Sequence, residues 1–73
     1  MVLVTGARGH IGNTLVYELS KIFPKDRLKI LVRSPKGIDH IKDLVSQVVI
    51  GDIKNYQDAQ KAVEGCQYVF HTA

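Results

Sequence analysis

The chain has 73 residues, which limits it to one small domain or part of one. Hydrophobic residues make up 45% of the sequence and charged residues 23%, a balance typical of chains that fold around a packed core, which argues against disorder and low complexity. The ten Lys and Arg residues give a net charge of +3, but they are scattered and do not form the basic cluster of a nucleic-acid-binding arm. We therefore expect no nucleic-acid partner, whereas an anionic ligand or a plain solvated surface would both suit this charge.

Nothing in the sequence indicates export or membrane insertion. The N-terminus lacks a basic segment, and its first apolar run stops at Thr5 and Gly6, which is too short to cross a bilayer. Cys66 is the only cysteine, so the chain cannot form an internal disulfide, and we expect this thiol to be buried and inert. These observations predict a cytoplasmic protein without a membrane partner.

Four short apolar runs are expected to form strands. They are rich in Val and Ile and do not alternate cleanly with polar residues, which is typical of strands covered on both faces of a parallel sheet. In chain order these runs are residues 2–5, 28–32, 48–50 and 68–70.

Helical periodicity separates the predicted strands. The clearest stripe has apolar residues three or four positions apart until Pro24 ends it, and it comprises Ile11, Leu15, Val16, Leu19, Ile22 and Phe23. A shorter helix is predicted after the Ser-Pro-Lys-Gly segment 34–37 by the spacing of Ile38, Ile41, Leu44 and Val45. A third should begin at Asn55, a suitable N-cap, and end at Gly65.

The resulting order is β-α-β-α-β-α-β. Strands that alternate with helices favour an α/β fold with a parallel sheet, helices on both faces and the first strand in the interior. No linker, repeat or second domain is visible in residues 1–73.

A glycine-rich turn, T-G-A-R-G-H-I-G at residues 5–12, joins the first strand to the first helix. A helix N-terminus offers main-chain N–H donors and a partial positive charge, which together favour a phosphate. Gly6 would allow the tight turn, Gly9 the close passage of a pyrophosphate, and Gly12 close packing of the helix on the sheet. Two residues separate Gly6 from Gly9, so the spacing departs from G-x-G-x-x-G, and the glycines alone would also suit an ordinary strand-to-helix turn.

Together with its flanks, this turn resembles the T-G-x-x-G-x-[IL]-G turn of extended short-chain dehydrogenases/reductases, the group of NAD(P)-dependent epimerases/dehydratases and dihydroflavonol-reductase-like enzymes. Three further segments agree with that family in order and spacing: L-V-R-S-P at 31–35, G-D-I at 51–53 and Y-V-F-H-T-A at 68–73. The resemblance covers essentially the whole chain. It implies that residues 1–73 form the N-terminal part of a single NAD(P)-binding Rossmann domain, with an incomplete Rossmann-type parallel sheet.

The residue at the end of the second predicted strand bears on the choice between NAD and NADP. An Asp or Glu there would accept hydrogen bonds from the ribose 2′-hydroxyl, but this chain has Arg33. A guanidinium forms bidentate pairs with phosphate, so we expect NADP as the cofactor, with NAD as the alternative. Arg8 would add a second cation and Ser34 a hydroxyl donor. Arg33 could instead be a solvated residue at a strand end.

The resemblance implies further cofactor contacts. Asp52 would accept a hydrogen bond from the adenine amino group and Ile53 would flank the base, although an Asp after Gly51 would equally suit a turn. The predicted cofactor-binding set, with no catalytic residue and no metal ligand, is Gly6, Arg8, Gly9, His10, Ile11, Gly12, Arg33, Ser34, Asp52, Ile53, Thr72 and Ala73.

Enzymes of this family use a Tyr-x-x-x-Lys pair, in which the lysine lowers the pKa of the tyrosine so that it can exchange protons with the substrate. Tyr17 and Lys21 have this spacing, but they are expected on the solvent face of the first helix, remote from the nicotinamide. The family's own pair belongs on a later helix, so we expect this chain to be an N-terminal segment that lacks it.

The leading hypothesis is the cofactor-binding portion of an NAD(P)-dependent oxidoreductase or epimerase/dehydratase. Such an enzyme would transfer hydride on a small carbonyl/alcohol or sugar-nucleotide substrate. The alternatives are a non-catalytic NADP-binding sensor of the same fold, and a structural fragment that binds nothing. The open edge of the last predicted strand could also support a homodimer.

Overall fold

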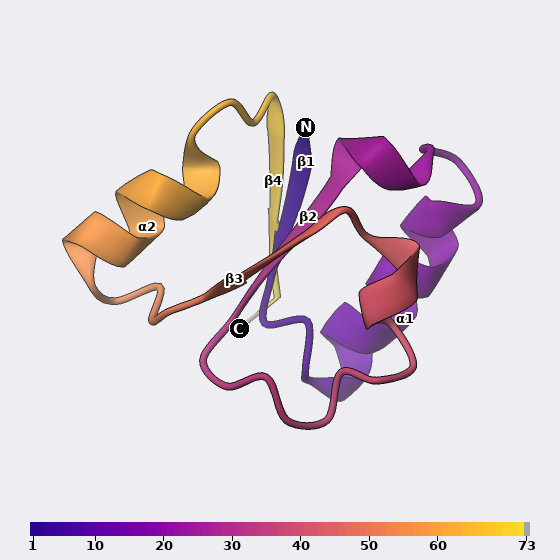
Figure 1. The fold of residues 1–73 in the computed structure, drawn as a ribbon, viewed down its shortest axis with the longest axis horizontal. Helices are drawn as coiled ribbons and strands as arrows, with labels where there is room; N and C mark the ends of the chain where they lie inside the picture. Colours follow the sequence, from indigo (N-terminus) through magenta and orange to yellow (C-terminus); the bar gives the residue numbers. More distant parts are fainter. Residues whose placement is uncertain (73) are drawn as a thin grey trace.

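The structure is a computed structural model that describes residues 1–72, and it is built on a four-stranded parallel sheet in the order β3-β2-β1-β4 (Figure 1). The strands are β1 (Val2–Thr5), β2 (Leu28–Val32), β3 (Gln47–Ile50) and β4 (Tyr68–His71). Each lies within one residue of its predicted bounds. The α/β fold class and the interior position of β1 are therefore confirmed.

β1 is the strand on which the sheet is assembled. It pairs with β2 on one side, where Val2 lies opposite Leu28, and with β4 on the other, where Val2 lies opposite Tyr68. β3 joins the outer side of β2. Since all pairs are parallel, the carboxyl ends of the four strands lie at the same edge of the sheet.

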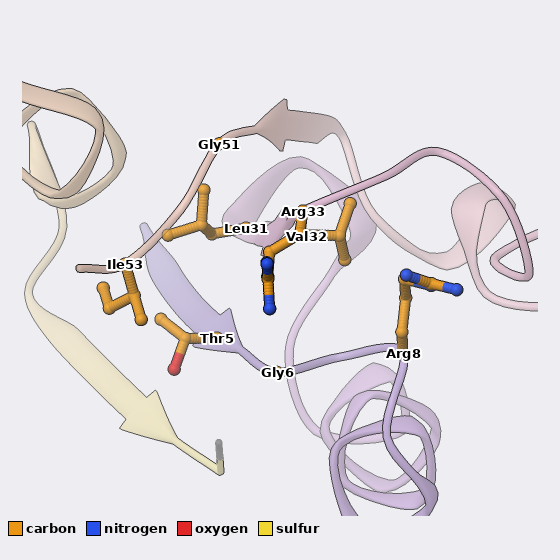
Figure 2. Close-up of a pocket in the computed structure, with 8 residues that line it drawn as sticks. All are labelled: Thr5, Gly6, Arg8, Leu31, Val32, Arg33, Gly51 and Ile53. Atoms are coloured by element: carbon orange, nitrogen blue, oxygen red, sulfur yellow. The ribbon is translucent and has the colours of Figure 1, made fainter. Parts of the chain in front are cut away.

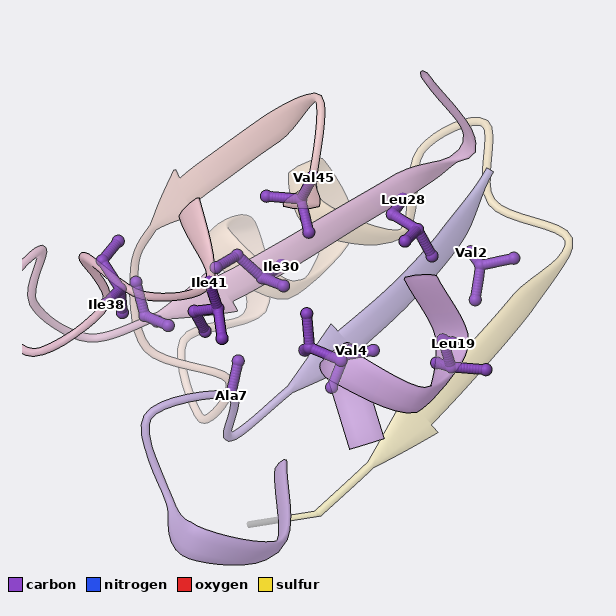
Figure 3. Packing of buried hydrophobic residues seen from close by; sticks show 11 residues of the cluster. Val2, Val4, Ala7, Leu19, Leu28, Ile30, Ile38, Ile41 and Val45 are labelled. Atoms are coloured by element: carbon purple, nitrogen blue, oxygen red, sulfur yellow. The ribbon is translucent and has the colours of Figure 1, made fainter. Parts of the chain in front are cut away.

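The helices α1 (His10–Ser20) and α2 (Tyr56–Val63) cover opposite faces of the sheet (Figure 1). Successive strand residues point to opposite faces, so each strand contributes to two cores. Val4 and Ile30 pack in the core under α1, as Figure 3 shows for the larger cluster, whereas Leu3 and Leu31 pack against Ala62 of α2. This division explains why the central strands read as continuous apolar runs.

The segment between β2 and β3 does not form the helix that its spacing predicts. It contains only a short 3-10 turn, η2 (Lys42–Leu44), although Ile38, Ile41 and Val45 are buried beside Ile30 (Figure 3). Gly37 has a left-handed φ of +80° and Val45 is already extended, so few residues remain for a helix. The apolar spacing therefore reports burial on the α1 face and not a regular helix.

The predicted stripe of α1 is wrong at two positions, Ile11 and Ile22. Val16 and Leu19 are buried and Leu15 and Phe23 partly so, but Ile11 is 71% exposed and Ile22 is 73% exposed. Ile11 belongs to the first turn, beyond the carboxyl end of β1, and Ile22 follows the last helical residue, Ser20, before a short 3-10 turn, η1 (Lys25–Arg27). The core contacts of α1 therefore come from its second and third turns, through Leu15, Val16 and Leu19.

The ends of α2 follow the prediction. Asn55 caps the helix, because its side-chain oxygen accepts the N–H of Asp58 at 3.0 Å, and Gly65 follows the helix with a left-handed φ of +74°.

Cys66 is only half-buried, contrary to expectation, because it lies just past the helix. Its Sγ donates to the carbonyl oxygen of Ala62 at 3.4 Å.

Lys29 of β2 is a buried charged residue, 5% exposed, on the side of the sheet that α2 covers. Its Nζ donates to the carbonyl oxygen of Glu64, the C-cap of α2, at 3.3 Å. A cation at a helix C-terminus is favourable, because the last carbonyl groups carry partial negative charge. This contact ties α2 to the sheet.

The start of α1 touches the end of β1 without room for a side chain. A Cβ at Gly12 would lie 2.2 Å from the carbonyl oxygen of Gly6 and 2.7 Å from Oγ1 of Thr72. Thr72 Oγ1 donates to the carbonyl oxygen of Thr5 at 2.7 Å, and His71 Nδ1 lies 2.6 Å from Thr5 Oγ1. The close packing predicted for Gly12 is therefore confirmed, and the end of β4 secures it.

Within residues 1–72, none of the helices combines the length and the apolar character that crossing a membrane requires.

Replacement of Gly12 by alanine should destabilise the protein. Alanine in a helix is normally better than glycine by about 1 kcal/mol, but here the methyl group must displace a main-chain oxygen, which should lower the free energy of unfolding by about 1 to 3 kcal/mol. Urea unfolding followed by circular dichroism would measure this. Thr14→Ala, at an exposed position of the same helix, is the control and should change stability little; equal stability of the Gly12→Ala protein would contradict the contact.

Replacement of Asn55 by alanine should lower the free energy of unfolding by about 1 kcal/mol, because the first turn of α2 loses its side-chain cap. The same urea titration applies. Gln57→Ala, an exposed position in the same helix turn, should be close to neutral. If the two variants proved equally stable, Asn55 would contribute no cap.

Candidate functional site

A pocket of about 130 Å³ opens at the carboxyl edge of the sheet (Figure 2). Carboxyl ends of parallel strands are where α/β proteins bind ligands, because the loops that follow the strands diverge there. The pocket is smaller than a whole-ligand site of roughly 300 to 1,000 Å³, so it suits one end of an extended molecule. Its lining comes from the ends of β1, β2 and β3 and the turns after them: Thr5, Gly6, Arg8, Leu31, Val32, Arg33, Gly51 and Ile53.

The glycine turn brings a helix N-terminus to the side of this pocket. Gly6 adopts a left-handed φ of +71°, and its carbonyl oxygen accepts the N–H of Gly9 at 3.0 Å, which closes the turn. Gly9 is the N-cap of α1, and within residues 1–72 no side chain caps that end and no acidic residue occupies the first turn. The N–H groups of the first turn thus keep their partial positive charge available to an anion.

Two arginines from different segments line the pocket. Arg33, at the end of β2, extends toward its middle, whereas Arg8 lines it from the glycine turn and its guanidinium points to the outer side (Figure 2). The Arg33 side chain is 79% exposed, and its Nε lies 3.9 Å from Oδ2 of Asp52. An ion pair this long and this exposed is weak, so Arg33 is free to engage a stronger anion. Ser34 lies beside it outside the lining, and its Oγ accepts the N–H of Lys36 at 3.3 Å.

The turn after β3 forms the opposite wall. Gly51 and Ile53 line the pocket, and Asp52 lies between them. Oδ1 of Asp52 accepts the N–H of Lys54 at 2.9 Å, so this residue does form the turn that its position after a glycine suggested. Its other oxygen faces Arg33. A role toward adenine stays a prediction.

The remaining predicted residues lie around the pocket. Gly9 and Gly12 belong to the turn and the first helical turn, and Thr72 uses its hydroxyl to hold the carbonyl oxygens of Thr5 and Gly6. His10 and Ile11 are exposed and border a separate shallow groove along α1 with Thr14, Leu15 and Glu18. Ala73, also predicted to bind the cofactor, lies outside the described residues.

Sequence reasoning missed four lining residues: Thr5, Leu31, Val32 and Gly51. Each is one of the last two residues of a strand or directly follows a strand. Only their position could have identified them, because the carboxyl ends of parallel strands lie beside the ligand regardless of which side chains they carry.

Tyr17 and Lys21 lie on the surface, as predicted. Tyr17 is 55% exposed, Lys21 Nζ lies 4.7 Å from the centre of its ring, and the same amine pairs with Glu18 at 3.4 Å. Neither residue borders the pocket.

Comparison with known proteins agrees with this geometry. A family model described as NAD(P)H-binding matches residues 6–73. Sterol demethylase protein B of Methylococcus capsulatus is 30% identical over 71 residues, which cover 97% of this chain and 21% of that protein. UDP-glucose 4-epimerase of Rickettsia canadensis is 29% identical in an alignment of length 82, which covers 99% of this chain and 23% of the epimerase.

Among solved structures, the NADPH-dependent quinone oxidoreductase QOR2 of Escherichia coli, complexed with NADPH, superimposes with a TM-score of 0.87. It is 22% identical, and the match covers 97% of this chain and 25% of that one. The chain thus spans about a fifth to a quarter of these proteins. The glycine turn and the parallel sheet agree with the match over residues 6–73, which shows that the chain belongs to the NAD(P)H-binding family, and the predicted likeness to extended short-chain dehydrogenases/reductases is confirmed.

Proposed function

We propose that this chain binds NADP(H) at the carboxyl edge of its sheet and serves as the cofactor-binding part of an oxidoreductase or epimerase/dehydratase. The observation that carries this proposal is that Arg8 and Arg33 line the same pocket, beside a helix N-terminus without a side-chain cap. Both features select for phosphate: the helix for a pyrophosphate, and the two guanidinium groups for a further phosphate at the ribose.

The pocket chemistry favours NADP over NAD. Recognition of an unphosphorylated ribose needs an acceptor at the end of β2, and Arg33 occupies that position as a pure donor. Within residues 1–72 its one anionic partner is Asp52, an exposed carboxylate 3.9 Å away, so a 2′-phosphate would be the better partner. Arg8, on the facing turn, would neutralise the second charge of that phosphate.

The other residues have roles that follow from their places. Gly6 and Gly9 leave the main chain bare where a pyrophosphate would approach the start of α1. Ile53 and Leu31 give the pocket an apolar surface suited to adenine, and the Asp52 carboxylate would accept from its amino group. When bound, the reduced cofactor would give hydride to a carbonyl and the oxidised cofactor would take it from an alcohol, on a small-molecule or sugar-nucleotide substrate. This chain would hold the adenosine and phosphate end of the cofactor.

The same proposal includes a contact of the outer strand β4 with another chain or with further residues of the whole protein. The outer strand β4 exposes apolar side chains, with Tyr68 60%, Val69 48% and Phe70 38% exposed, which supports a homodimer contact or the docking of further chain along it. The cytoplasmic location stays a prediction from the sequence.

Replacement of Arg33 by aspartate should reverse the cofactor preference. The change removes the partner of the 2′-phosphate and places a carboxylate beside it, so the ratio of NADPH to NADH affinity should fall about tenfold or more. Titration calorimetry with each cofactor measures the ratio. Arg27→Asp makes the same charge change in an exposed turn away from the pocket and is the control. An unchanged ratio in Arg33→Asp would remove this residue from the site.

Replacement of Gly9 by valine should abolish detectable binding of both NADPH and NADH, because the side chain would occupy the approach of the pyrophosphate. The fold should mostly survive, since the backbone at Gly9 has φ −70° and ψ 162°, which valine adopts easily, although a Cβ there would lie 3.3 Å from the carbonyl oxygen of Gly6 and require a small shift. Calorimetry would test binding and circular dichroism the fold. Thr14→Val, further along the same helix, is the control and should bind normally; retained affinity in Gly9→Val would make the turn purely structural.

A further inference from the structure

The side chain of Asp58 forms a hydrogen bond outside its own helix. Asp58 is the third residue of α2 after the cap Asn55, a position from which an acidic side chain commonly bonds back to the N–H of the cap. Here the N–H of Asn55 donates instead to the carbonyl oxygen of Asp52 at 2.9 Å. Oδ2 of Asp58 accepts the N–H of Asp52, also at 2.9 Å. The carboxylate therefore fixes the turn before the helix.

Gly51 is shaped to receive this carboxylate. A Cβ at Gly51 would lie 2.9 Å from Cγ of Asp58 and 3.0 Å from its Oδ2, so the side chain rests directly on the bare main chain. Gly51 and Ile53 line the pocket, and Asp52 faces Arg33 between them. Asp58 thus lies behind the pocket wall, outside the residues that line it.

The hydrogen bond from the Asp52 N–H to the Asp58 carboxylate fixes the main chain of Asp52, its side chain and the position of Ile53. It sets the direction of the Asp52 main chain, and through it the side chain, whose Oδ1 is held by the N–H of Lys54 at 2.9 Å while Oδ2 faces Arg33. It also places Ile53, the next residue. Asp58 is partly buried, and a charged acceptor of a main-chain N–H forms one of the stronger hydrogen bonds in proteins.

We propose that Asp58 is a positioning residue for the adenosine end of the cofactor: its carboxylate holds the turn of residues 51–53 so that Ile53 and Asp52 meet the base and Arg33 stays directed at the ribose phosphate. This inference rests on the proposed function. It assigns to α2, which does not touch the pocket, a share of cofactor affinity and selectivity.

The experiment compares three variants of this chain. Asp58→Ala removes the acceptor, Asp58→Asn keeps an amide oxygen at the same place, and Asn55→Ala removes the cap of the same helix while leaving the Asp58 carboxylate on Asp52. Affinities for NADPH, for adenosine 2′,5′-bisphosphate and for reduced nicotinamide mononucleotide are measured by NMR titration at a temperature where every variant is folded. The Asp52 amide resonance reports the hydrogen bond itself.

In Asp58→Ala, affinity for NADPH and adenosine 2′,5′-bisphosphate should fall about tenfold, as expected for loss of a charge-assisted hydrogen bond, while affinity for reduced nicotinamide mononucleotide stays unchanged. Asp58→Asn should recover most of the affinity, and Asn55→Ala should bind like the original chain despite its lower stability.

Two results would overturn the inference while leaving the proposed function in place: unchanged affinities in Asp58→Ala, or equal losses in Asp58→Ala and Asn55→Ala, which would reduce Asp58 to a stabiliser of α2. Failure of the unmodified chain to bind NADPH and the bisphosphate would overturn the proposed function itself, and the role of Asp58 with it.

Discussion

The contact between Gly12 and the carbonyl oxygen of Gly6 sets the distance between the first helix and the sheet. Because neither residue carries a side chain, α1 can begin where β1 ends, and its N-terminus arrives at the same edge as the carboxyl ends of β2 and β3. A larger separation would move the helix amides away from the pocket. Phosphate recognition by this fold therefore requires the close approach of Gly12 to Gly6 in addition to the positive charge at the helix N-terminus.

Around that contact the site consists mainly of apolar side chains and main-chain groups, with few polar side chains. Strand ends provide apolar walls, two turns provide main-chain edges, and the arginines provide the charge. The pair between Arg33 and Asp52 is loose and solvated, so it costs little to exchange for a phosphate. By contrast, the turn that carries Asp52 is fixed by the carboxylate of Asp58 and by the main-chain N–H of Asn55. The site thus combines a hydrogen-bonded turn with exposed guanidinium groups.

The sequence predicted the elements wherever local chemistry and tertiary packing agree. The strands, the glycine turn, and the cap and end of α2 all have signals within a few residues, and each was found. The second crossover was misread because Ile38, Ile41 and Val45 have helical spacing but are buried by a loop, and burial alone cannot distinguish the two. Ile11 was misread because periodicity does not show where a helix runs past its sheet.

The pairing of β1 has a consequence for how the chain folds. One neighbour of β1, the strand β2, follows after a single helix. The other neighbour is β4, and the contact of Thr5 with His71 at its end joins residues 66 positions apart in the sequence. Contacts this distant form late, because a long loop must close before any of them is made. During synthesis, one edge of the central strand stays open until nearly the whole segment has emerged, and this interval is when the nascent chain is most exposed to mispairing with its neighbours.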